Sequence, residues 1–289
     1  MTIRTIIMPF ASHANAKQRI SGALSVAQFF DAHLDVLHAQ INPKQLLPEE
    51  RQLISDEFYK RIDQIVADYV SEDAEPLKAL FEDACQRLHI STQTRIPRYA
   101  TSQPETTAMW QDVYGFRGEV VAEKGKLSDM TIIPQAKRGK SSVSFEAAIL
   151  HSGKPVLIMP RTQDVFAPKH ATIAWNGDTQ AAKAVTAAMP LLRKVDTVTI
   201  ATSERSVNNK PTQSELQDYL AMHGIQSESK VFGASRLRAP QALLEQAAAL
   251  NSDVIVCGAY SHQRIHQQMF GDFTKSLLKR STIPLFMMS

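Results

Sequence analysis

Short apolar runs alternate with longer segments of helical periodicity along most of the chain. The runs contain β-branched and large apolar residues, which favour strands, whereas the longer segments repeat apolar residues every three or four positions, which predicts amphipathic helices. In the first half, we predict strands at 3–8, 33–40, 92–99, 129–134 and 155–160, and helices at 15–32, 47–70, 74–88, 104–126 and 142–152. In the second half, we predict strands at 170–175, 196–201, 226–232, 252–257 and 283–288, with helices between them.

The regular alternation of strands and helices determines the type of sheet. A helix between two successive strands carries the chain back along the sheet, so the strands run parallel and the crossovers are right-handed. The near-continuous apolar run Val254–Cys257 is typical of a strand that is buried on both faces. We therefore predict an α/β fold built from doubly wound parallel sheets.

The two halves of the chain repeat one pattern. Residues 128–133 lead through an apolar helix to the Pro-containing strand at 153–159, and residues 252–257 lead in the same way to 282–288. Such self-similarity indicates the duplication of one α/β unit. We predict tandem domains at 1–161 and 169–289, a linker at 161–169, and an inserted helical pair at 47–88 in the first domain.

The composition is that of an ordinary globular protein, with 44% hydrophobic and 21% charged residues. The 32 Lys and Arg against 29 Asp and Glu give a net charge of +3, which is too even to predict a nucleic-acid partner. No run approaches the roughly 18 apolar residues that span a bilayer. Pro9 interrupts the apolar run at 6–11, which favours an opening strand over a secretion signal. Cys85 and Cys257 lack any disulfide-framework or zinc-finger spacing, so we expect two structural thiols and a cytoplasmic protein. Since no apolar run could span a bilayer, we expect no membrane partner.

The richest segment for function runs from the last strand but one to the last helix. In a doubly wound sheet, ligands bind at the carboxyl ends of the strands where the winding reverses, which brings the turn Asn176-Gly177 beside Gly258. Gly258 would let the backbone approach a phosphate closely, and glycine can also adopt a positive φ without a Cβ clash. Gly271 and Thr274 would open the last helix, whose free N–H groups attract an anion.

The same segment carries a family resemblance. From Gly258 to Thr274 it resembles the phosphate-binding loop of the universal stress proteins, which reads Gly, two residues, Gly, nine residues, Gly, and then Ser or Thr. The outer glycines, Gly258 and Gly271, have the separation found in the family. Ser261 replaces the middle glycine and Asp272 replaces the hydroxyl residue, although the ending from Gly271 to Thr274 is closer to the Gly-Gly-x-Thr variant.

These departures define what the second domain could still do. Asn176 stands where the opening strand of the family usually ends in Asp, and it keeps an amide that can hydrogen-bond a base or a ribose. Ser261 costs roughly 1–2 kcal/mol if its position requires a left-handed backbone. Asp272 is interpreted as a helix N-cap or as a residue that shares Mg²⁺, and Arg264 or Lys275 would supply positive charge.

The first half resembles the same family more distantly. Pro134 and Lys137 replace the first two glycines of the loop, and the loop before Ser142 is shorter, so we interpret this half as a degenerate copy. The resemblance implies a five-stranded parallel sheet ordered 3-2-1-4-5 in each domain. It also implies that the two domains pair with each other through their final strands.

The resemblance implies a stress-response sensor or signalling protein that binds an adenine nucleotide in its second domain, with ATP and Mg²⁺ as the candidate ligands. One alternative is a nucleotide-independent scaffold that binds protein partners or a second copy of itself, and another is a weak ATP hydrolase using Mg²⁺ near Asp272 and Thr274. The sequence contains no nucleophile elbow and no paired-carboxylate motif. We therefore predict no catalytic residues. His262 and His266 lack a third ligand nearby, so we also predict no metal site.

Overall fold

The computed structural model describes residues 2–10, 14–40, 74–94, 105–135, 142–233, 239–259 and 272–289. The first half contains β1 (Thr5–Phe10), α1 (Ala16–Phe30), β2 (His33–Gln40), β3 (Ser91–Thr92), β4 (Thr107–Tyr114), α3 (Arg117–Gly125), β5 (Met130–Pro134), α4 (Val143–His151) and β6 (Val156–Met159), and residues 74–87 are also helical. The second half contains β7 (His170–Ala174), α5 (Thr179–Leu192), β8 (Thr197–Ser203), α6 (Gln213–Met222), β9 (Glu228–Phe232), α7 (Ala239–Ala249), β10 (Val254–Gly258), α8 (Asp272–Arg280) and β11 (Leu285–Met288).

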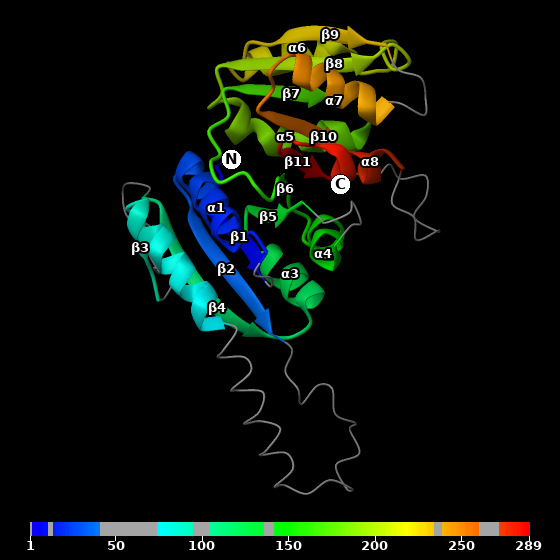
Figure 1. Cartoon of the computed structure of the whole chain (residues 1–289). Coiled ribbons are helices and arrows are strands. Elements are labelled where there is room, and N and C mark those ends of the chain that lie inside the picture. Colours follow the sequence, from blue (N-terminus) through cyan, green and yellow to red (C-terminus); the bar gives the residue numbers. More distant parts are fainter. Residues whose placement is uncertain are drawn as a thin grey trace, which may run out of the picture.

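The strands form one continuous sheet in the order β3-β4-β2-β1-β5-β6-β11-β10-β7-β8-β9 (Figure 1). The second half alone has the strand order 3-2-1-4-5, and the first half repeats this order with the short β3 added at its edge. Neighbouring strands are parallel within each half, whereas β6 and β11 pair antiparallel, with Phe286 opposite Leu157. The predicted α/β fold, the strand order and the pairing of the final strands are therefore confirmed.

The central strands of the sheet are buried on both faces, and since successive residues point to opposite sides they belong to two different core clusters. In β10, Val254 and Val256 belong to the core cluster that also includes α1, α5 and α6, whereas Ile255 and Cys257 belong to the cluster under α4, α7 and α8. The first of these clusters extends from β1 to β11 across both halves. One hydrophobic layer therefore joins the two halves of the chain.

The segment between β6 and β7 is packed against α1 rather than extended in solvent. The backbone N–H of Phe166 donates to Ser25 Oγ at 2.8 Å, and the Phe166 ring meets that of Phe29 at a centroid distance of 5.3 Å. Gly22 lies directly below the segment, where a Cβ would come within 2.6 Å of the Gln163 carbonyl oxygen. This close approach explains the glycine in the middle of a helix.

One sequence prediction in the first half is wrong: the predicted helix at 104–126 is instead the strand β4 followed by α3. Of the predicted strand at 92–99, the described residues include as strand only the end of β3 (Ser91–Thr92), and residues 95–99 lie outside the described residues. β4 pairs with β2 along its whole length, from His33 opposite Thr107 to Gln40 opposite Tyr114. This long ladder overrides the weak helical pattern, because strand formation depends strongly on tertiary context. The predicted helix at 47–70 falls outside the described residues.

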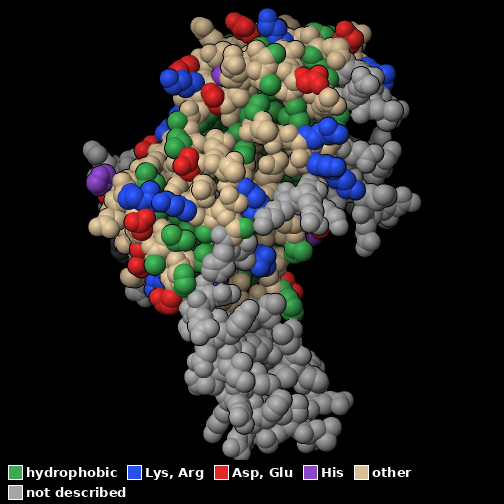
Figure 2. All heavy atoms as spheres, viewed as in Figure 1, with side chains coloured by type: hydrophobic (Ala, Val, Ile, Leu, Met, Phe, Trp, Pro, Cys, Tyr) green, Lys and Arg blue, Asp and Glu red, His purple; other side chains and the backbone are tan. Residues whose placement is uncertain are grey.

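The surface carries charges of both signs. On the face shown in Figure 2, Lys and Arg side chains are interspersed with Asp and Glu side chains over both halves. Among the described residues, no helix combines the length and the apolar character that crossing a membrane requires.

Candidate functional site

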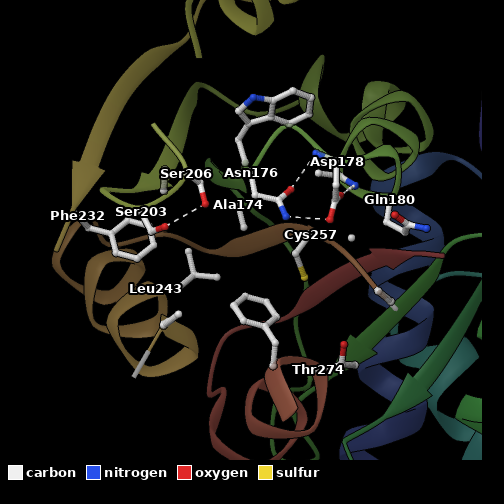
Figure 3. Close-up of a pocket in the computed structure, with 17 residues that line it drawn as sticks. Ala174, Asn176, Asp178, Gln180, Ser203, Ser206, Phe232, Leu243, Cys257 and Thr274 are labelled. Carbon is white, nitrogen blue, oxygen red and sulfur yellow. Dashed lines mark hydrogen bonds between the residues drawn. The ribbon is translucent and has the colours of Figure 1, made fainter. Parts of the chain in front are cut away.

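A cavity of about 330 Å³ opens in the second half, at the carboxyl ends of β7, β8 and β10 (Figure 3). Its size lies at the lower end of the range for small-molecule sites, roughly 300–1,000 Å³. β7 lies between β10 and β8 in the sheet, and α5, which follows β7, packs on the opposite face from α7 and α8. The cavity therefore occupies the point where the winding reverses, which is the usual ligand position in an open α/β sheet.

One wall is the turn that connects β7 to α5. Asn176 Nδ2 donates to Asp178 Oδ2 at 2.8 Å, and the backbone N–H of Asp178 donates to Asn176 Oδ1 at 3.2 Å. Gly177 adopts a φ of +79°, and Asp178 Oδ1 accepts from the N–H of Ala181 at 2.8 Å as the N-cap of α5. The side chain of Asn176 lines the cavity but is held within this turn. Gly177 forms the turn without lining the cavity.

Gly258 lines the cavity at the end of β10, but its structural role differs from the prediction. A Cβ at this position would come within 2.7 Å of the backbone N of Ala181 and within 2.8 Å of the Cβ of Gln180. Among the described glycines, a positive φ is found at other positions, such as Gly177, and not at Gly258. Gly258 therefore does not use the positive φ that glycine permits; the residue is small because β10 packs closely against the start of α5.

A third wall is the start of α8. Phe273 and Thr274 line the cavity, and Thr274 is only 3% exposed. The first turn of this helix carries N–H groups without an intrahelical partner and the positive end of the helix dipole. The structure thus brings Asn176, Gly258 and Thr274 to one cavity. Ser261, Arg264 and Gly271 lie outside the described residues, as does the side chain of Asp272.

The remaining wall is mainly apolar, with two hydroxyl groups. Ala174, Ala201, Leu243, Phe232 and Cys257 contribute apolar surface from four strands and α7. Burial raises the pKa of the Cys257 thiol to about 12, so this thiol stays neutral and acts as a small apolar residue, as predicted. Ser203 Oγ donates to Ser206 Oγ at 3.2 Å beside the apolar surface (Figure 3).

The sequence analysis missed several residues of the cavity. Asp178 contributes the one charged side chain among the described lining residues. Ser203 and Phe232 are the last residues of β8 and β9, and Ser206 follows β8. The available signal was positional, because every segment that follows a parallel strand reaches this edge of the sheet.

No family model matches the chain, and no curated protein matches it. Among solved structures, a universal stress protein from Archaeoglobus fulgidus DSM 4304 superimposes with a TM-score of 0.69 at 14% identity, over 98% of this chain and 97% of that one. A putative universal stress protein from Pseudomonas aeruginosa UCBPP-PA14 superimposes with a TM-score of 0.52 at 14% identity, over 99% of this chain and 93% of that one. Along its whole length, the chain has the fold of the universal stress proteins.

Proposed function

We propose that the protein binds an adenine nucleotide in the second-half cavity and acts as a stress-response sensor or signalling protein. The observation that carries this proposal is the combination of an apolar wall with two helix N-termini, those of α5 and α8, around one cavity at the winding reversal. An apolar wall suits a planar base, and a helix N-terminus suits a phosphate. The universal stress protein fold supports the same ligand class by analogy alone.

The lining residues fit the two ends of such a ligand differently. The base would lie against Ala201, Leu243 and Phe232, where the Ser203 and Ser206 hydroxyls can hydrogen-bond its polar edge. The phosphates would point toward the first turn of α8, where Thr274 adds a hydroxyl donor. Since the described lining residues include Asp178 and no Lys or Arg, Mg²⁺ accompanying ATP would reduce the repulsion between this carboxylate and the phosphates.

The test is a thermal melt of the full chain with and without excess Mg-ATP, with Mg-GTP and adenosine as comparison ligands. A ligand present at about a hundred times its Kd stabilises the native state by roughly 2.7 kcal/mol, which corresponds to a Tm increase of several degrees. We expect an increase with ATP and adenosine and a smaller one with GTP. No increase with ATP and no nucleotide in the purified protein would contradict the proposal.

Two variants connect the response to the cavity. Ala174→Phe places a ring in the cavity from the end of β7, where the side chain is only partly buried, so we expect it to abolish the ATP response. Thr274→Val keeps the shape of the side chain but removes its hydroxyl, so we expect it to weaken ATP more than adenosine. Thr186→Val, whose hydroxyl donates to the Ala182 carbonyl on α5, is the matched control and should respond like the unmodified chain.

The second candidate is a nucleotide-independent scaffold for protein partners. It is favoured by the engagement of both polar ends of Asn176 within its own turn. It is also favoured by the acidic character of the one charged lining residue that the structure describes, Asp178. Under this alternative, Ala174→Phe would leave the binding of protein partners unchanged, and ATP would not alter the Tm of any variant.

A further inference from the structure

The first half contains a second, smaller cavity at the position that corresponds to the nucleotide cavity of the second half. It has a volume of about 90 Å³ and lies at the carboxyl ends of β1 and β5, which occupy the same places in the strand order as β7 and β10. Pro9 and Pro134 line it from these strands, and Ser142 lines it from the start of α4. Pro134 is one of the substitutions that make this half a degenerate copy.

Three arginines converge on the small cavity from three separate elements. Arg19 comes from α1, Arg117 is the first residue of α3, and Arg161 follows β6. Arg19 is 7% exposed, and its guanidinium carbon lies 4.4 Å from the centroid of the Phe10 ring. Burial, together with the nearby charges of Arg161 and Arg117, lowers the pKa of Arg19 to about 10. Burial also lowers the pKa of Arg117 and of Arg161.

The ion pairs among the described residues do not include Arg117 or Arg161. They join His33 to Asp35, His38 to Asp112, Arg87 to Asp83 and Lys194 to Asp31. Arg161 Nε donates to the Gln135 carbonyl at 2.6 Å, but its Nη1 is buried without a hydrogen-bond partner among the described residues. Such an unsatisfied donor is costly and points to a missing acceptor.

The start of α4 adds to the positive potential. Ser142 is the N-cap of this helix, and its Oγ accepts from the Phe145 N–H at 3.1 Å. Ser144, in the first turn, also lines the cavity. A helix N-terminus attracts negative charge, and guanidinium groups match the geometry of an oxyanion through paired N–H donors. A bound oxyanion would accept from Arg161 Nη1 and relieve the repulsion among the three cations.

We propose that this cavity binds a compact phosphate-class oxyanion between Arg19, Arg117 and Arg161, at the N-terminus of α4. The volume limits what can enter, because 90 Å³ corresponds to the share of about three water molecules in liquid water. A free phosphate, or the phosphoryl group of a larger molecule whose remainder stays outside, fits this limit. A nucleoside does not, since small-molecule sites typically start at about 300 Å³. The proposal therefore does not depend on nucleotide binding in the second half.

The test is calorimetric titration of the full chain with inorganic phosphate, with sodium chloride at matched ionic strength as the reference. We expect one saturable phosphate site per chain. Arg117→Gln removes one guanidinium from the first residue of α3, and we expect it to weaken phosphate binding at least tenfold. Lys124→Gln removes the same charge from the exposed last turn of the same helix and should leave the affinity within twofold.

Two further arms make the result specific. Arg117→Lys keeps the charge but loses the paired donors, so we expect an intermediate affinity; Arg161→Gln replaces Arg117→Gln if circular dichroism shows that the latter does not fold. Ala174→Phe should retain phosphate binding, because it alters only the second-half cavity. Glucose 6-phosphate binding as tightly as phosphate identifies a phosphoryl group of a larger ligand, and phosphate binding alone identifies the free anion. The proposal is overturned by the absence of a saturable phosphate site, by equal losses in Arg117→Gln and Lys124→Gln, or by loss of binding in Ala174→Phe.

Discussion

Gly258, at the end of β10, lies against Gln180 in the first turn of α5, so that a Cβ on residue 258 would come within 2.8 Å of the Cβ of Gln180. The first turn of α5 cannot yield easily, because the Ala181 N–H is held by the Asp178 side chain. Overpacking at such a position typically costs about 1–3 kcal/mol. We therefore expect Gly258→Ala to lower the free energy of unfolding by this amount in the absence of any ligand, as measured by urea denaturation.

Gly233→Ala is the matched control for this prediction. Among the described residues, the atoms nearest to its new Cβ would be those of the Glu204 carboxylate, at 3.6 Å or more, and the backbone does not adopt a positive φ there. Its unfolding free energy should equal or slightly exceed that of the unmodified chain, because alanine restricts the unfolded state more than glycine does. A Gly258→Ala variant as stable as Gly233→Ala would contradict the proposed packing role. Because Gly258→Ala changes packing, it is also a poor probe of phosphate contact.

The N-cap of α5 links helix stability to the cavity. Asp178→Ala removes the acceptor for the Ala181 N–H and releases the side chain of Asn176. Loss of an N-cap costs about 0.5–2 kcal/mol, so we expect a loss of that size in urea denaturation. We also expect an altered Tm response to Mg-ATP, because the turn forms one wall of the cavity.

Thr212→Ala separates these two effects. Thr212 caps α6 through a reciprocal pair with Glu215, and neither residue lines the cavity. This variant should lose a similar free energy of unfolding while keeping the ATP response of the unmodified chain. Equal ATP responses in Asp178→Ala and Thr212→Ala would show that the β7–α5 turn does not contribute to ligand binding.

The fold could be predicted from the sequence where both faces of a strand are buried. β10 is a continuous apolar run and β5 is interrupted by Thr131 alone, because each contacts a helical layer on either side. β4 was missed because polar residues such as Gln111 and Asp112 interrupt its apolar pattern, and its burial decreases toward its end. The partner that makes it a strand, β2, is distant in the sequence. Local periodicity carries no information about such a ladder.

The candidate sites, like the fold, could be predicted only in part from the sequence. The convergence of Asn176, Gly258 and Thr274 on one cavity could be predicted, because parallel strands bring their carboxyl ends to one edge of the sheet. The role of each residue there remains a prediction. Arg19 and Arg161 line one cavity although they are far apart in the sequence, and they belong to no common motif. Their proximity depends on how α1 and the segment after β6 pack, which no spacing rule expresses.

The two cysteines should make the protein sensitive to alkaline pH. Burial raises the pKa of the Cys257 thiol from 9.0 to about 12, and burial together with the charge of Glu82 does the same for Cys85. The folded state therefore retains these protons at pH values where the unfolded chain loses them. The contribution to stability is complete below pH 9 and is lost as the pH rises toward 12. At pH 10 the loss is about 1.4 kcal/mol for each thiol.

A double variant measures this contribution. Urea denaturation at pH 7.5 and pH 10 should show a smaller loss of stability for Cys85→Ala with Cys257→Ala than for the unmodified chain, by about 3 kcal/mol. In addition, both thiols should react with a disulfide reagent only at the rate of unfolding, since each is at most 2% exposed. Equal pH dependence in the two proteins, or rapid reaction of a native thiol, would contradict the prediction.

Gln135 joins the two halves through the end of α8. Its Nε2 donates to the carbonyl of Leu278 at 3.0 Å and to that of Ser281 at 2.7 Å. The backbone carbonyl of Gln135 accepts from Arg161 Nε. Carbonyls at the end of a helix have no intrahelical partner and carry the negative end of the helix dipole. Gln135→Leu removes both donors, and we expect a loss of about 1–3 kcal/mol in the free energy of unfolding.

Gln135→Glu should be more harmful at neutral pH than Gln135→Leu, because its carboxylate would face two carbonyl oxygens instead of donating to them. These oxygens favour the protonated acid, which can donate one hydrogen bond, so the pKa of the introduced carboxyl should rise above that of the unfolded chain. Stability is then greatest below the unfolded pKa of about 4.3 and decreases as the pH rises through the higher folded value. Urea denaturation at pH 4.5 and pH 7.5 should show that the deficit relative to the unmodified chain shrinks at the lower pH. Gln86→Glu, on the exposed face of the helix at 74–87, is the control and should stay within about 0.5 kcal/mol of the unmodified chain at both pH values. A deficit in Gln135→Glu that does not change with pH would show that the carboxyl does not face the carbonyls of α8.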